Sequence, residues 1–467
     1  MPAPVPTPVG RGLFGDVFRF RREPLPTLFR AWRECGDVVR LRFGAVNPHL
    51  VLHPDGVQHV LQTNARNYDK QTRGFNKLKL ALGEGLLTSE GALWRKQRRA
   101  IQPAFHKDRV EGFAAIMTEA AASMLDGWDK RSEPLEAFDV TEEMTALTLD
   151  IIARTMFSAE LGADSKSLAD MVTLAGRHIN SRITSLTGML DFWERLPTPA
   201  NRRFWAALRQ GDGLIQKVIE RRRGGDADPL EASELGGEPR GDLLSMLMAS
   251  RDQETGEAMS DQQLRDEVVT IFSAGHETTA QALTWTFYLL STHPEAEQRL
   301  RDEVRAALGD ARPTLADLPR LGYAARVIKE AMRLFPPAWA ISRRAEAEDH
   351  IGGYRIPARA FVLLCPYLTH RHPGFWENPE GFDPDRFLPE RSQGQHRFAY
   401  VPFGAGARMC IGSNFAMMEA QLVLATIAQR FRLRLVPGHP VELEPLITLR
   451  SRKGMRMTAA AVDNNSS

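Results

Sequence analysis

The sequence carries one periodic apolar run that is long enough to span an entire domain. It begins at Ser260, where Gln263 three residues later completes a capping-box pattern, and it continues to Thr292 before His293 and Pro294 interrupt it. A helix of this length measures roughly 48 Å. We therefore expect it to pass through the middle of a large helical fold.

Helical spacing also dominates most of the remaining chain. From about Pro54 to Leu334, apolar residues recur three and four positions apart, and Gly and Pro clusters rather than strand-like alternation interrupt them. The stretch Gly224–Asp242, rich in Gly, Pro and acidic residues, is the expected surface connection. Beyond Pro336 the pattern changes to short strand-like pieces and a meander with little periodicity over His372–Pro402.

The fold class that follows is mainly α, with one large helical domain and a small β-rich lobe. We place this domain at residues 25–460, between a Pro-rich lead at residues 1–24 and a tail at residues 461–467. Two helices are expected near its ends, over Pro26–Glu34 and Ser413–Arg430. The predicted strands are Val38–Phe43, His49–His53, Gly353–Ile356, Phe361–Leu364, Arg432–Val436 and Leu446–Leu449.

Composition excludes several function classes. The chain has 467 residues, of which 43% are hydrophobic and 25% charged, as in globular proteins. A formal charge of +2 lacks the basic excess of a nucleic-acid binder, so we expect no nucleic-acid partner. The three cysteines are too few and too scattered for a disulfide framework, which indicates a reducing setting. No segment offers the ~20 apolar residues of a membrane span. We expect a cytoplasmic monomer.

The sharpest local feature is the loop Phe403–Gly412, which brings Cys410 to the start of the final helix. Its glycines allow tight turns and a close approach to a bulky flat group. The helix start supplies N–H groups and a positive potential that stabilise a thiolate. We therefore expect Cys410 to bind a metal.

The same loop matches the pattern F-x-x-G-x-R-x-C-x-G at every fixed position, and it resembles the haem-binding loop of the cytochrome P-450 family of haem-thiolate monooxygenases. The resemblance spans the chain from about Leu25 to Met457 and points to a soluble bacterial-type member. It implies haem b as the cofactor and Cys410 as the axial iron ligand. Further haem-binding positions implied within the loop are Phe403, Arg408 and Gly412.

The segment Ala274–Thr279 reads A-G-H-E-T-T in the middle of the long helix and resembles the oxygen-activating motif of the family. Cleavage of the O–O bond consumes two protons, which an acid and a hydroxyl in an apolar wall can supply. The resemblance therefore implies that Glu277 and Thr278 are catalytic and relay protons. It also places Ala274 beside the haem.

Three charged residues match structural motifs of the family. Glu330 and Arg333 stand in the E-x-x-R pattern, whose spacing puts both side chains on one helical face. Arg386 stands in the P-x-R-F pattern of the meander. The resemblance implies that the three form a buried charge cluster, which holds the meander and the haem loop and does not touch substrate.

Haem carries two propionates, which fixed arginines bind best. The resemblance implies that Trp94 and Arg98, in a W-x-x-x-R pattern, and Arg408 bind them. It adds an arginine in a strand after the Pro-Pro break. We assign this position to Arg343, with the adjacent Arg344 as the alternative.

Three further cations lie beside the W-x-x-x-R residues and project elsewhere by helical geometry. Arg95, Lys96 and Arg99 are either solvated surface charges or a basic patch that guides an acidic redox protein to the thiolate side of the haem. The sequence leaves both interpretations open.

Substrate-facing segments are implied only by the resemblance, at residues 67–87, 172–204, 338–341 and 446–448 and on the wall of the long helix. They indicate an apolar pocket for a hydrophobic small molecule such as a fatty acid, a terpenoid, a steroid or a polyketide-like compound. The candidate lining side chains are Phe75, Leu82, Phe272, Trp339, Ile341 and Ile447.

The implied reaction hydroxylates such a molecule with O2, two electrons and two protons. No flavin or iron–sulfur pattern is visible, so we expect electrons from NAD(P)H to arrive through a ferredoxin or flavodoxin and its reductase. Two alternatives remain open: a peroxygenase or rearranging enzyme that needs no external electrons, and a non-catalytic haem-based ligand sensor or carrier. The pair Glu277 and Thr278 weighs against both.

Overall fold

The computed structural model describes residues 4–8, 16–43, 47–130, 136–158, 164–184, 194, 196–224, 242–251 and 256–462. Most of the predicted connection Gly224–Asp242 lies outside these residues, as do part of the predicted substrate-facing region 172–204 and the end of the predicted tail.

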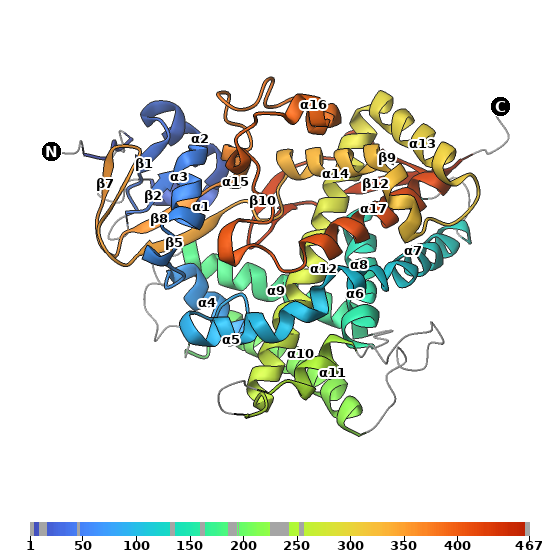
Figure 1. Ribbon diagram of the computed structural model, residues 1–467, viewed down its shortest axis with the longest axis horizontal. Coiled ribbons are helices and arrows are strands. Elements are labelled where there is room, and N and C mark those ends of the chain that lie inside the picture. The colour runs from blue at the N-terminus through green and yellow to red at the C-terminus, as the bar shows by residue number, and fades with distance from the viewer. Residues whose placement is uncertain are drawn as a thin grey trace.

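Helices make up most of the described chain, which confirms the mainly α class (Figure 1). The helix predicted at Pro26–Glu34 is α2, and the final helix has the predicted bounds as α17. The helices are α1 Val17–Arg22, α2 Pro24–Cys35, α3 Pro54–Gln58, α4 Arg73–Leu82, α5 Gly91–Ile101, α6 Lys107–Glu111, α7 Ala114–Asp129, α8 Val140–Phe157, α9 Asp164–Thr184, α10 Pro199–Arg223, α11 Leu243–Ala249, α12 Asp261–Thr292, α13 Pro294–Leu308, α14 Gly322–Leu334, α15 Pro366–Thr369, α16 Pro389–Ser392 and α17 Ser413–Arg430.

The long helix α12 occupies the centre of the helical part, as expected (Figure 1). At its start the Ser260 hydroxyl accepts a hydrogen bond from the N–H of Gln263 at 3.2 Å. At its end the N–H of His293 donates to the carbonyl of Leu290. Between these caps most side chains of α12 are buried, because α8, α10, α14 and α17 pack around it.

The main sheet joins the N-terminal part of the chain to a segment some 300 residues later. Its order is β1-β2-β8-β5-β3, with β2 and β8 parallel and the other neighbours antiparallel. Figure 1 shows the blue N-terminal strands lying beside the orange later ones, next to the helical part. The strands are β1 Val38–Arg40, β2 His49–Val51, β3 Tyr68–Asp69, β5 Ile341–Ala345 and β8 Phe361–Leu364.

The other strands form smaller sheets. One contains β4 (Phe138–Asp139), β12 (Arg456–Ala461) and β9 (Phe431–Leu435) in that order, and the others are the hairpins β6–β7 (Asp349–Ile351, Tyr354–Ile356) and β10–β11 (Leu443–Pro445, Leu449–Ser451). The alanines of β12 have little strand preference, and that strand was not predicted.

The strand predicted at Leu446–Leu449 is wrong. Residues 446–448 form the turn between β10 and β11, and only Leu449 belongs to a strand. A tertiary hydrogen bond rather than strand pairing holds the backbone of this turn. The Trp339 indole N–H donates to the Leu446 carbonyl at 2.8 Å, and Leu449 is fully buried.

The N-terminal segment is attached to the domain. The N–H of Arg40 donates to the carbonyl of Pro6 at 2.9 Å, and Arg30 of α2 pairs with Asp16, just before α1, at 2.7 Å. The domain limits at residues 25 and 460 stay predictions. No helix in the described part of the chain is long and apolar enough to cross a membrane.

Candidate functional site

Cys410 lies in the glycine-rich loop, three residues before α17 begins at Ser413. Its backbone N–H donates to the carbonyl of Phe403 at 2.9 Å, which closes the loop. Gly406 has a positive φ of 67°, and a Cβ there would collide with the carbonyl oxygen of Leu61. Only glycine therefore lets this loop approach the 59–63 segment so closely.

The Cys410 side chain is exposed, whereas Cys365 is fully buried in the core. Burial raises the pKa of the Cys410 thiol, while the N–H of Gly412 and the charge of Arg98 lower it. A bound metal cation would favour the thiolate there.

The middle of α12 presents a second open face inside the fold. Ala274 is exposed and Thr278, one turn later, is partly exposed, whereas the neighbouring His276 and Ala280 are buried. The Thr278 hydroxyl donates to the Ala274 carbonyl at 2.7 Å. Exposed side chains on a helix that is otherwise enclosed indicate room beside Ala274 and Thr278 for a bulky group such as haem.

Phe272 departs from the expectation that it lines this face. On a helix it points about 200° away from Ala274, and its ring stacks on Phe157 of α8 with centroids 4.3 Å apart. With 4% exposure it belongs to the core.

Three cations lie near or in the haem loop: Lys70 and Arg343 are buried, and Arg408 is partly buried. The charge of Arg408 acts on both Lys70 and Arg343, and Glu90 is a carboxylate that acts on all three cations. Arg408 pairs with Glu90 at 2.7 Å and donates to the Ser89 carbonyl at 3.0 Å.

The electrostatics of this group favour an anionic ligand. Burial and the charge of Arg408 lower the pKa of Arg343 to about 10. Burial, Arg408 and Arg343 lower the pKa of Lys70 well below its usual range. Three cations with one close carboxylate leave an excess of positive charge, which is costly without a counter-ion. The two propionate carboxylates of haem would supply the negative charge that balances this excess.

The remaining positions implied for the propionates flank the same group. The guanidinium of Arg408 stacks over the Trp94 ring at 3.8 Å. Arg98, one turn after Trp94 on α5, donates to the Met409 carbonyl at 3.0 Å. Arg344 instead pairs with Asp69. Because neighbouring strand residues point to opposite faces, Arg343 is the arginine of β5 that faces Lys70 and Arg408.

Glu277 is buried and already has partners. Arg450 of β11 contacts its carboxylate at 2.6 Å, and the Thr448 hydroxyl donates to the same oxygen. Arg450 also donates to the Thr173 hydroxyl of α9 at 3.1 Å. The acid of the A-G-H-E-T-T motif is thus held by the β10–β11 hairpin.

Glu330, Arg333 and Arg386 meet in one buried cluster. Glu330 pairs with Arg333 at 2.7 Å and with Arg386 at 3.0 Å. Both arginines also donate to meander carbonyls, and Arg333 reaches that of His370. Burial and Arg333 lower the pKa of His370 to about 3, so this ring is neutral and accepts the N–H of Val401 at 2.8 Å. The cluster therefore connects α14 to the chain that enters the haem loop.

The other candidate pocket residues lie in differing surroundings. Phe75 is partly buried with the Lys70 ammonium 5.2 Å from its ring, and Leu82 is buried in the main core. Trp339 is buried and holds the 446–448 turn. Ile341 is partly buried, and Ile447 is 37% exposed.

Sequence analysis missed Lys70, Glu90 and the Arg450 partner of Glu277. Lys70 and Glu90 stand in no motif, and Arg450 lies 173 positions from Glu277. No local signal marks these residues, and only the fold brings them to the site.

Comparisons with known proteins find relatives that match over nearly the whole chain. A family model described as cytochrome P-450 matches residues 4–455. The chain is 41% identical to cyclooctatin synthase of Streptomyces melanosporofaciens, with 95% of this chain and 92% of that protein covered. It is 38% identical to cyclooctat-9-en-7-ol 5-monooxygenase of the same organism (91% and 88% covered) and 33% identical to pentalenene oxygenase of Streptomyces avermitilis (96% and 95% covered).

A solved structure is similar over the same extent. The crystal structure of the cytochrome P-450DA heme domain superposes with a TM-score of 0.86 at 29% sequence identity, covering 99% of this chain and 98% of that chain. The similarity therefore includes both the helical part and the sheets.

Proposed function

The chain belongs to the cytochrome P-450 family of haem-thiolate monooxygenases, and we propose that its substrate is an apolar cyclic alkene or alkenol of terpenoid type. The enzyme uses haem b, O2 and electrons that reach it from NAD(P)H through redox partners. The proposal on the substrate rests on the relatives named for cyclooctat-9-en-7-ol and pentalenene, which match over nearly the whole chain.

The proposed roles of the site residues follow from their placement. Haem, when bound, supplies the oxidising iron. Cys410 would hold the iron, and the open face at Ala274 would receive the flat ring. The propionates would be bound or neutralised by Trp94, Arg98, Arg343, Arg408 and Lys70.

The substrate proposal is tested by binding and by product analysis. Pentalenene, a cyclic alkenol, a fatty acid and a steroid are added to the haem-loaded enzyme, and the spin-state shift of each is recorded. We expect the cyclic alkene or alkenol to give the largest shift. With a surrogate ferredoxin and isotopically labelled O2, its product should carry one labelled oxygen atom. A larger shift and faster turnover with the fatty acid would contradict the proposal.

Glu277 and Thr278 are proposed to deliver protons. Thr278 lies on the open face of α12. The carboxylate of Glu277, one residue earlier, binds Arg450 and Thr448 and so links α12 to the β10–β11 hairpin. We expect Thr278→Ala and Glu277→Gln to divert electrons to peroxide, because loss of a proton relay slows O–O cleavage more than electron uptake. Product per NAD(P)H should fall ~10-fold or more, which corresponds to at least ~1.4 kcal/mol at the affected step.

The control for this prediction is Thr292→Ala, which removes the same hydroxyl from the exposed end of α12. Peroxide and product are both measured, together with haem content. Unchanged coupling in both site variants would contradict the proton role.

We propose that the electron donor is a ferredoxin or flavodoxin, and that the enzyme acts as a cytoplasmic monomer. Arg95 and Arg99 are exposed on α5, the helix whose Arg98 contacts the loop beside Cys410. The adjacent Met409 is also exposed, at 38%. A basic and partly apolar surface beside the thiolate suits an acidic redox protein.

Reversing both charges in the Arg95→Glu, Arg99→Glu double variant should slow association with an acidic ferredoxin ~10-fold at low salt, since steering of this kind is electrostatic. Stopped-flow reduction at several salt concentrations measures the rate and its salt dependence. The control is the double variant Arg221→Glu, Arg312→Glu, which changes the total charge by the same amount. Its two positions are exposed, one on α10 and one after α13. Equal association rates in the two double variants would show that Arg95 and Arg99 are ordinary surface charges with no role in docking.

A further inference from the structure

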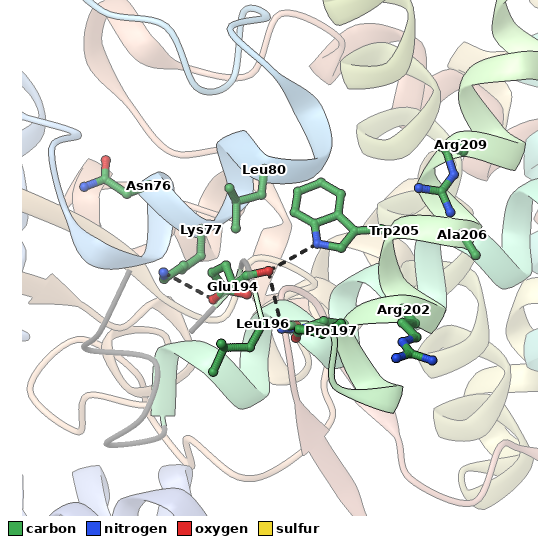
Figure 2. A pocket seen from close by; sticks show the side chains of 11 residues that line it. Asn76, Lys77, Leu80, Glu194, Leu196, Pro197, Arg202, Trp205, Ala206 and Arg209 are labelled. Carbon is green, nitrogen blue, oxygen red and sulfur yellow. Dashed lines mark hydrogen bonds and ion pairs between the residues drawn. The ribbon is translucent and has the colours of Figure 1, made fainter. Parts of the chain in front are cut away.

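A loop of eight residues, Gly83–Glu90, connects α4 to α5, and we call it the α4–α5 loop. Before the loop, α4 forms one wall of a cavity of about 970 Å³, which is lined mostly by the segments 67–87 and 172–204. Figure 2 shows Lys77 and Leu80 of α4 on that wall. The α4–α5 loop therefore leads from the cavity wall to the cations proposed for the haem propionates.

The second half of the α4–α5 loop holds two of these cations. The Lys70 ammonium donates to the Leu87 carbonyl at 2.7 Å, and the Lys70 backbone N–H donates to the Glu90 carboxylate at 3.1 Å. Arg408 donates to the Ser89 carbonyl at 3.0 Å and pairs with Glu90 at 2.7 Å. The places of both cations therefore depend on the backbone of this half of the loop.

Two adjacent acids near the start of α12 hold the first half of the loop. The Asp266 carboxylate accepts the N–H of Glu84 at 2.8 Å, and the Glu267 carboxyl group accepts the N–H of Leu86 at 2.9 Å. Gly83 permits this approach, because its φ is +63° and a Cβ there would lie 2.2 Å from the Asp266 carboxylate. Both acids are buried, so the loss of either acceptor is costly.

Gln97 of α5 joins the two halves of the loop. Its amide N–H donates to the Glu84 carbonyl at 2.6 Å, and its amide oxygen accepts the Ser89 hydroxyl. Gln97 is fully buried and also acts on the carboxyl group of Glu267. A continuous chain of hydrogen bonds thus runs from α12 through the loop to the propionate cations.

Glu267 is the better of the two acids for an experiment. Asp266 also pairs with Arg265 at 2.9 Å, so its replacement would break a second contact. Burial raises the pKa of Glu267 to about 8, which outweighs the opposing effect of the Leu86 N–H, so this acid is mostly protonated near pH 7. Gln therefore keeps its size, its neutrality and an acceptor oxygen, whereas Met keeps the size and removes the acceptor.

We propose that Asp266 and Glu267 are positioning residues for the haem propionates. They act from α12 by fixing the α4–α5 loop, which in turn holds Lys70 and Arg408. This inference rests on the propionate roles proposed above and extends them to a part of α12 that lies well before the A-G-H-E-T-T motif.

The test compares Glu267→Met with Glu267→Gln in the haem-loaded enzyme. Haem transfer to apomyoglobin should be ~10-fold faster in Glu267→Met, because the loop loses a buried hydrogen bond and the propionates lose part of their support. The ferrous-to-ferric ratio at a fixed potential should fall roughly threefold, since less compensated propionate charge favours ferric iron. Glu267→Gln should keep the parent values of both quantities. Equal effects of Met and Gln would overturn the proposal.

Arg408→Gln separates this inference from the propionate roles on which it rests. The variant should itself speed haem transfer, and adding Glu267→Met to it should have a smaller effect than in the parent, because both act through the same cation. Unchanged haem transfer in Arg408→Gln would contradict the propionate role of Arg408. Full additivity of the two variants would contradict the positioning role of Glu267 alone.

Two further variants complete the experiment. Ser89→Ala removes only the hydroxyl that binds Gln97, so it keeps the test available should Glu267→Met fail to fold, and haem transfer should be roughly threefold faster. Unchanged transfer in Ser89→Ala would contradict the proposed chain of hydrogen bonds. Asp261→Asn is the matched control, because Asp261 begins α12, is 70% exposed and pairs with Arg223 instead of the loop. A faster haem transfer in this control would also overturn the proposal.

Discussion

Replacing Cys410 with serine is expected to abolish hydroxylation, with a loss of at least ~1,000-fold, or ~4 kcal/mol at the affected step. A thiolate donates electron density to the iron and promotes O–O cleavage, and a serine hydroxyl does neither. The variant should still fold, because the side chain is exposed and Cys410 closes the loop through its backbone N–H to Phe403. Product formation with a surrogate ferredoxin and the absorption of the reduced carbonyl complex measure the effect.

Cys35→Ser is the control for this experiment. Cys35 ends α2 beside the main sheet and is only partly buried, so its loss should leave both the carbonyl spectrum and the turnover unchanged. A thiolate-type carbonyl spectrum that survives in Cys410→Ser would show that another residue ligates the iron.

The elements that the sequence predicted best are those whose bounds are set by residues close together in the chain. The bounds of α12 follow from the Ser260 cap and from Pro294, and α17 begins directly after the last loop glycine. The Cys410 loop was recognisable because its glycines and its cysteine are neighbours in the chain. Short-range rules therefore sufficed for the central helix and for the Cys410 loop.

The partners of the site could not be predicted because they depend on long-range packing. Glu277 meets Arg450 only because the β10–β11 hairpin folds back onto α12. Lys70 joins Arg343 and Arg408 only because β3 pairs with β5. Phe272 packs on Phe157 rather than beside Ala274, because residues two apart on a helix face nearly opposite directions.

Removing one member of the Glu330, Arg333 and Arg386 cluster is expected to leave little haem-loaded protein. Glu330→Ala leaves two buried arginines without their carboxylate partner and also removes the acceptor of the Asp383 N–H. Arg333→Ala removes one of the two arginines that pair with the Glu330 carboxylate, and it frees the carbonyls of His370, Pro379 and Gly381. Leaving a buried charge unpaired costs about 3 to 5 kcal/mol. Urea unfolding and haem content of the purified variants measure this loss.

Arg299→Ala isolates the effect of burial in this prediction. Arg299 pairs with Asp385 at 2.9 Å, so its loss also breaks an ion pair to the segment Pro384–Phe387, but its side chain is 54% exposed. Exposed pairs contribute about 0 to 1 kcal/mol, so Arg299→Ala should retain haem. If Glu330→Ala and Arg299→Ala cost the same, the cluster is not what holds the meander. If only the buried variants lose haem, α14 supports the Cys410 loop through the Arg333 bond to His370 and the His370 bond to Val401.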